Sequence, residues 1–178
     1  TREAVVAPES GVTRDRKEGE ADWSGRSFVI VDTGGIDLMS DEPLIDEVRQ
    51  QAQIAVSEAA VAIFLLDGKA GVAPQDHEIA ALLRKSKLPV ILAVNKTDSQ
   101  AARDNLYDYW QLGLGEPVGI SAEHGLGVGD LLDLVVQALP APEEVPEVAP
   151  PMRVAIVGRP NVGKSSLLNL LGLLDLPR

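Results

Sequence analysis

The residues best placed to do chemistry form one glycine-rich segment, residues 158–165, with the spacing G-x-x-x-x-G-K-S. An apolar run precedes this segment and a leucine-rich run follows it, so it is predicted to join a buried strand to a helix. This context is typical of a phosphate-binding loop, whose glycines let backbone N–H groups turn toward a β-phosphate. Lys164 is expected to reach the β- and γ-phosphates, and the Ser165 hydroxyl is expected to coordinate Mg²⁺.

A second polar group, D-T-G-G at residues 32–35, follows an apolar run and has the spacing D-x-x-G. The carboxylate of Asp32 can hold Mg²⁺ through a water molecule, and the N–H of Gly35 can approach a γ-phosphate because no side chain intervenes. In isolation, D-x-x-G is equally typical of an ordinary turn. Thr13 lies in a segment without sustained periodicity, so it is either a further Mg²⁺ ligand or a solvated loop residue.

A third group, N-K-T-D at residues 95–98, follows the apolar run 89–94. Asp98 can accept hydrogen bonds from guanine N1–H and the 2-amino group, a pair of donors that adenine lacks. Lys96 can lay its stem against the base, and the N–H of Ala122 can reach guanine O6. Together with the two preceding groups, these residues predict GTP as the ligand and not merely any anion.

The composition limits the possible folds and binding partners. A chain of 178 residues suits one α/β domain, and an aromatic content of 3% predicts an aliphatic core, as in parallel strands buried on both faces. The net charge of −11 disfavours direct binding to nucleic acid. There is no cysteine, no apolar run of membrane length and no signal peptide, so a soluble cytoplasmic protein without membrane contact is expected.

Strand and helix patterns alternate along the chain, which predicts a doubly wound, mostly parallel sheet with helices on both faces, as in P-loop NTPases and small GTPases. Polar groups follow the strands, so they are expected at the carboxyl edge of the sheet. The expected strands are 18–24, 26–32, 60–66, 89–94, 116–120 and 153–157, and the expected helices are 42–58, 75–85, 101–112 and 127–139.

Five motifs together resemble the Der (EngA) family of bacterial ribosome-assembly GTPases: G-R-P-N-V-G-K-S, G-V-T-R-D, D-T-G-G, N-K-T-D and S-A-E-H-G. Members of that family carry two GTPase domains in tandem and a C-terminal KH-like domain. By this resemblance, residues 1–139 are a first GTPase domain without its own first strand and P-loop. Residues 140–151, rich in proline and glutamate, are the linker, and residues 152–178 begin the second domain. The chain is therefore expected to be a fragment.

The resemblance also implies a function and a chemistry. The implied function is GTP hydrolysis in assembly of the large ribosomal subunit, which the full-length protein would contact. Ile36 stands where many small GTPases place a water-orienting glutamine, and similar GTPases compensate with K⁺ held partly by the asparagine that is Asn161 here. The alternatives are a guanine-nucleotide-binding switch or interdomain module without catalytic activity, and an assembly module that docks on the ribosome without nucleotide.

The expected site residues fall into three groups. The catalytic residues are expected to be Lys164, Asn161, Asp32 and Gly35. The residues expected to bind GTP or GDP are Gly158, Arg159, Pro160, Asn161, Val162, Gly163, Lys164, Ser165, Asp32, Thr33, Gly34, Gly35, Ile36, Asn95, Lys96, Thr97, Asp98, Ser121 and Ala122. The metal ligands are expected to be Ser165, Thr13 and Asp32 for Mg²⁺ and Asn161 for K⁺.

The position of the phosphate loop, after all the other elements, raises a problem of connectivity. The strand that feeds such a loop is central in this kind of sheet, and without it the neighbouring strands would present unpaired N–H and C=O groups. Residues 153–157 are predicted to fill that slot from the C-terminal side. A linker of twelve residues at about 3 Å each spans about 35 Å, which is enough for the crossing. The chain would then fold as a circular permutant.

Overall fold

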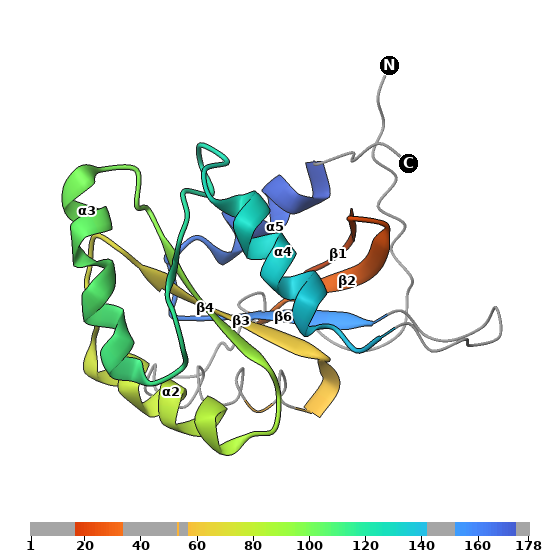
Figure 1. Cartoon of the computed structure of the whole chain (residues 1–178), viewed down its shortest axis with the longest axis horizontal. Helices are drawn as coiled ribbons and strands as arrows, with labels where there is room; N and C mark the ends of the chain where they lie inside the picture. Colours follow the sequence, from red (N-terminus) through yellow and green to blue (C-terminus); the bar gives the residue numbers. More distant parts are fainter. Residues whose placement is uncertain (1–16, 34–52, 54–56, 142–151, 174–178) are drawn as a thin grey trace, which may run out of the picture.

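The structure, a computed structural model, describes residues 17–33, 53, 57–141 and 152–173. These residues form a six-stranded sheet with the order β1-β2-β6-β3-β4-β5 and helices on both of its faces (Figure 1). The strands are β1 (Lys17–Trp23), β2 (Arg26–Asp32), β3 (Val61–Asp67), β4 (Val90–Asn95), β5 (Val118–Gly119) and β6 (Arg153–Val157). The helices are α2 (Pro74–Lys85), α3 (Gln100–Asp104), α4 (Val128–Ala138), α5 (Lys164–Leu173) and the 3₁₀-helix η2 (Asn105–Leu112).

Strand β6 occupies the centre of the sheet, as the sequence predicts. It pairs in parallel with β2, where Val31 lies opposite Ala155, and with β3, where Ile63 lies opposite Ile156. Figure 1 shows this strand, in blue, between two strands that come from the first part of the chain. Its residues Val154 to Val157 are at most 2% exposed, because helices cover both faces. The predicted filling of the central slot by residues 153–157 is therefore confirmed.

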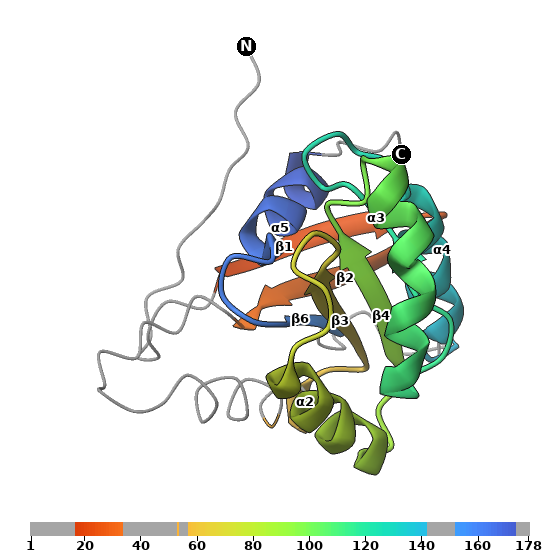
Figure 2. The same cartoon turned by 90° about the vertical axis from the view of Figure 1, so that its left-hand side faces the viewer.

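Two aliphatic cores lie on opposite faces of the sheet, with β3 contributing to both. Its side chains alternate, so that Ile63 and Leu65 pack on the side of α4 and α5, whereas Phe64 and Leu66 pack on the side of α2 and η2. Figures 1 and 2 show α4 and α5 on one side of the sheet and α2 on the other. An unbroken apolar strand is what burial on both faces demands.

The antiparallel hairpin of β1 and β2 forms one edge of the sheet, and it also follows from the sequence. Ser24 and Gly25 connect the strands with φ angles of 51° and 73°. Positive φ at both central residues is the geometry of a type I′ turn, whose twist matches that of the strands. The remaining pairings are parallel, so the predicted fold class is confirmed.

For one predicted helix, the type of helix is wrong over most of its length. Residues 101–112 were expected to form a single α-helix, but α3 ends at Asp104 and eight residues of 3₁₀-helix follow. The apolar residues Leu106, Tyr109 and Leu112 recur every three positions, and in a 3₁₀-helix residues three apart lie on one face. The tighter helix therefore turns all three toward the core on the side of α2, where Tyr109 and Leu112 are buried and Leu106 is partly buried, and it leaves Tyr107 79% exposed.

The edge strand β5 is shorter than predicted, since only Val118 and Gly119 of the expected residues 116–120 pair with β4. The preceding Pro117 has no N–H to donate to a ladder. Other predictions fall outside the described residues: Thr13, Gly34 to Ile36, most of the helix 42–58, and residues 142–151 of the linker. The division of the chain into parts of two domains therefore stays a prediction. Among the described residues, no helix is long and apolar enough to span a membrane.

Hydrogen exchange tests the central position of β6. The amides of residues 154–157 are expected to be as protected as those of residues 90–94 in β4, because both strands are hydrogen-bonded and buried inside the sheet. Native-state exchange followed by mass spectrometry or NMR measures both sets in one sample. Rapid exchange in residues 154–157 beside slow exchange in residues 90–94 would show that β6 does not belong to the sheet.

Candidate nucleotide-binding site

The polar groups predicted from the sequence meet at the carboxyl edge of the sheet. Asp32 ends β2, Gly158 follows β6, Asn95 ends β4, and Ser121 comes shortly after β5. Because β2, β6, β3 and β4 are adjacent and parallel, these residues lie side by side. The residues of the three motifs that the structure describes are thus brought together at one place.

The glycines of the phosphate loop are required by close packing. A Cβ atom on Gly158 would collide with the carbonyl oxygen of Leu65 in β3. Gly163 has a φ of +98°, and a Cβ atom there would collide with the amide nitrogen of Asn95. The second contact shows that the phosphate loop and the N-K-x-D group touch each other directly, so each limits the conformation of the other.

Lys164 is held inside the loop. Its Nζ donates hydrogen bonds to the carbonyl oxygens of Gly158 at 2.7 Å and Arg159 at 2.9 Å, and the residue is only 7% exposed. Burial lowers the pKa of Lys164, while the charge of Asp32 acts in the opposite direction. The ammonium group thus lies where the backbone of the loop would surround a phosphate.

Ser165 and Asp32 supply a pair of oxygens suited to Mg²⁺. The Ser165 hydroxyl donates to Asp32 Oδ2 at 2.8 Å, and Asp32 is fully buried. Within the described ranges, no three His, Asp or Glu side chains gather as a metal site. Mg²⁺ is commonly held by one or two protein oxygens together with water and phosphate oxygens, so this pair fits that ion. The neighbouring Thr33 donates to the carbonyl of Ile156 at 2.6 Å, which joins β2 to β6.

Asn95 connects three of the predicted groups through one side chain. Its Nδ2 donates to the carbonyl of Val162 in the phosphate loop at 2.8 Å, and its Oδ1 accepts the N–H of Ala122 at 2.9 Å. The Thr97 hydroxyl adds a 2.9 Å bond to the carbonyl of Ile120. The Ala122 N–H, predicted to reach guanine O6, donates to Asn95 in this structure, and its role toward guanine stays a prediction.

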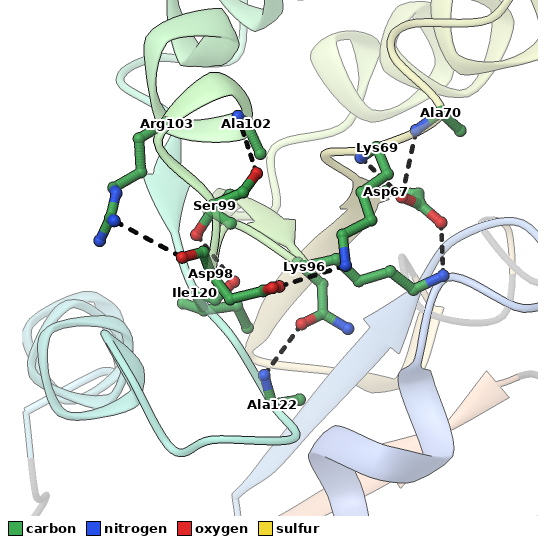
Figure 3. A network of polar contacts seen from close by, with 12 residues as sticks. Asp67, Lys69, Ala70, Lys96, Asp98, Ser99, Ala102, Arg103, Ile120 and Ala122 are labelled. Atoms are coloured by element: carbon green, nitrogen blue, oxygen red, sulfur yellow. Dashed lines mark hydrogen bonds and ion pairs between the residues drawn. The ribbon is translucent and has the colours of Figure 1, made fainter.

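Lys96 and its partner Asp67 belong to the polar network drawn in Figure 3. Lys96 Nζ donates to Asp67 Oδ2 at 2.6 Å and to the carbonyl of Asn161 at 3.1 Å. Burial alone would raise the pKa of Asp67, but hydrogen bonds from Lys96 and from the N–H groups of Lys69 and Ala70 outweigh it and lower that pKa. Asp67 therefore stays ionised and fixes the lysine of the N-K-x-D group against the phosphate loop.

Asp98, the predicted reader of guanine, presents an ionised and accessible carboxylate. Its side chain is 32% exposed, and Lys69 Nζ lies 3.5 Å from Oδ1 (Figure 3). A hydrogen bond from its own backbone N–H, with a further contribution from Lys69, lowers the pKa of Asp98. An ionised carboxylate only accepts hydrogen bonds, which is what the two donors of guanine require.

Three participating side chains do not belong to any predicted motif: Asp67, Lys69 and Asp76. Asp67 ends β3, Lys69 lies between β3 and α2, and Asp76 lies in the first turn of α2. Asp67 ends an apolar strand, as Asp32 and Asn95 do, and this position could have identified it in the sequence as a site residue. The guanidinium of Arg159 lies at Asp76, with Nε 2.7 Å from Oδ1, and the predicted contact of Arg159 with the nucleotide stays a prediction.

A phosphate loop after the central strand of a mostly parallel sheet, with N-K-x-D at the end of β4 two strands away, defines the class of P-loop GTPases. The chain belongs to the family described as 50S ribosome-binding GTPase, which matches residues 1–96 and 153–172. The two matched parts together include the strands β2, β3, β4 and β6.

The similar proteins agree with this assignment. A protein of Herpetosiphon aurantiacus named GTPase Der is 49% identical over 96% of this chain, and one of Desulforudis audaxviator with the same name is 51% identical over 94%. The chain spans 39% and 38% of the lengths of these relatives. The solved structure of translation elongation factor SelB from Methanococcus maripaludis, in complex with the GTP analogue GppNHp, covers 75% of this chain and 30% of its own, with a TM-score of 0.55. At 21% identity, that likeness concerns the fold alone.

The contact between Gly163 and Asn95 can be tested by Gly163→Ala. The variant is expected to lower the free energy of unfolding by about 1–3 kcal/mol more than Gly115→Ala does. Gly115 is a matched control, because its φ of +96° is nearly the same but nothing lies within 4 Å of an added Cβ. Urea denaturation of both variants measures the difference, and equal losses would show that backbone strain alone matters at Gly163.

Proposed function

We propose that this chain binds GTP and GDP at the carboxyl edge of its sheet. The observation that carries the proposal is the insertion of β6, because it brings Ser165 to within 2.8 Å of Asp32 and Val162 to within 2.8 Å of Asn95. The residues expected to hold phosphate, Mg²⁺ and guanine thus become neighbours within one chain.

The proposed reaction is hydrolysis of the γ-phosphate. Lys164 would place positive charge at the β- and γ-phosphates, and the oxygens of Ser165 and Asp32 would orient Mg²⁺, which neutralises charge that develops on the phosphate oxygens. Asp98 would select guanine. By resemblance to the Der family, K⁺ held partly by Asn161 would supply further positive charge.

The proposed biological role is assembly of the large ribosomal subunit, carried out by a longer protein of which this chain forms a part. The support is the family description and the names of the relatives, whose length exceeds that of this chain more than twofold. With a net charge of −11, this part is not expected to bind RNA directly. Contact with the ribosome would then be made by other parts of the protein.

Nucleotide binding by this chain is the decisive measurement. Titration with fluorescent GDP in the presence of Mg²⁺ is expected to show saturable binding that GTP displaces and ATP does not, because Asp98 pairs with donors that only guanine offers. Lys164→Ala is expected to weaken binding by about a hundredfold or more, since it removes the charge-assisted contact with phosphate. Displacement by ATP as effective as that by GTP would refute the guanine assignment.

Phosphate release separates an enzyme from the alternative, a binding module without catalytic activity. At saturating GTP, release is expected to be about tenfold or more faster in KCl than in NaCl of equal ionic strength. Asn161→Gly removes the side chain and tolerates the φ of 63° at this position, so it is expected to abolish the difference between the salts. Tight binding without phosphate release in either salt would favour the non-catalytic module.

A further inference from the structure

A buried pair of opposite charges lies beside the phosphate loop. Arg159 Nε is 2.7 Å from Asp76 Oδ1; the Asp76 side chain is fully buried and that of Arg159 is 21% exposed. Asp76 stands in the first turn of α2, where its second oxygen accepts the N–H of Ala73 at 2.8 Å. Removing two charges from water is costly, so a pair in this position requires an explanation.

Stability is a poor explanation for this pair. The contact between the two side chains is an ion pair between Arg159 Nε and Asp76 Oδ1. Nε and Nη2 of Arg159 and Oδ1 of Asp76 are buried without a hydrogen-bond partner. Burial raises the pKa of Asp76, although the N–H of Ala73 and the charge of Arg159 oppose that shift. Replacing a buried ion pair by well-packed apolar side chains is often neutral or stabilising, so stability alone does not account for the pair.

The position of the ion pair beside the phosphate loop explains it better than stability does. The main chain of Arg159 supplies one of the two carbonyls that accept from Lys164 Nζ, so its side chain and its backbone connect Asp76 to the phosphate-binding lysine. Helix α2 is a rigid anchor for this connection, because one of its faces is buried in the core through Ile79, Ala80 and Leu83. The phosphate loop is thereby fixed to a helix on one face of the sheet.

We propose that Asp76 is a positioning residue for the phosphate loop, acting through Arg159 to hold the loop in the conformation that binds a β-phosphate. The inference rests on the proposed function of that loop. Arg159 then has a structural partner in α2 and does not contact the nucleotide itself. Loss of Asp76 should weaken ligands that have a β-phosphate and should spare the recognition of guanine, which lies at the N-K-x-D group.

The test compares GDP with GMP, which lacks the β-phosphate. Asp76→Asn removes the charge and keeps an oxygen that can accept the N–H of Ala73. Calorimetric titration is expected to show a fall of about tenfold or more in affinity for GDP and a change of less than about twofold for GMP. Asp130→Asn is the matched control, since it removes an exposed acidic residue from the first turn of α4. It is expected to leave both affinities unchanged.

A double-variant cycle separates positioning from direct contact with phosphate. Arg159→Met and the double variant Asp76→Asn/Arg159→Met are expected to lose the same GDP affinity as Asp76→Asn, because all three remove one interaction. If Arg159→Met weakens GDP and Asp76→Asn does not, Arg159 contacts phosphate directly and the inference is wrong.

Two further outcomes would also overturn the inference. An unchanged ratio of GDP to GMP affinity in Asp76→Asn would mean that the pair does not position the loop. Should that variant not fold, Asp76→Glu, which keeps the charge and moves it by one methylene, is expected to lower the same ratio, and an unchanged ratio has the same meaning. Binding of neither nucleotide by the unaltered chain would refute the proposed function and this inference with it.

Discussion

The parallel pairing of β6 with both β2 and β3 is the constraint on which the rest of the structure depends. Without that strand, the facing edges of β2 and β3 would carry unpaired backbone groups in the middle of an apolar core. With it in place, the two cores close above and below the sheet. The turn that follows β6 then lies between Asp32 on one side and Asn95 on the other, so the same pairing that completes the core also completes the site.

The cations around the phosphate loop differ in what holds them. Two cations in or beside the loop are held by carboxylates from β3 and α2: Lys96 by Asp67, and Arg159 by Asp76. Lys164, in contrast, is held by two carbonyl oxygens. A carbonyl carries no net charge, so the positive charge of Lys164 is the one left for an incoming phosphate. The two cations paired with carboxylates therefore fix the loop, whereas Lys164 is the cation that would bind the ligand.

Sequence patterns predict much of this arrangement because strands buried on both faces leave a distinct signal. The apolar runs before Asp32, Asn95 and Gly158 identify three strands, and their carboxyl ends locate the site. The 3₁₀-helix η2 escapes prediction, because Leu106, Tyr109 and Leu112 fit one face of either helix type over so short a length. The ion-pair partners of Lys96 and Arg159 could not be predicted either. These pairs form only because the fold places Asp67 and Asp76 against loops that are far away in the sequence.

The central place of β6 also affects how the chain can fold. β6 is the last strand in chain order and yet the middle of the sheet, so each of its pairings joins segments far apart in sequence. Contacts of high sequence separation form slowly, since the entropy of closing a long loop must be lost before the contacts form. Strands β3 and β4 can associate early with α2, whereas the edge of β3 that faces β2 stays open until residues 153–157 arrive. The phosphate loop, which begins where β6 ends, is therefore expected to take its shape late in folding.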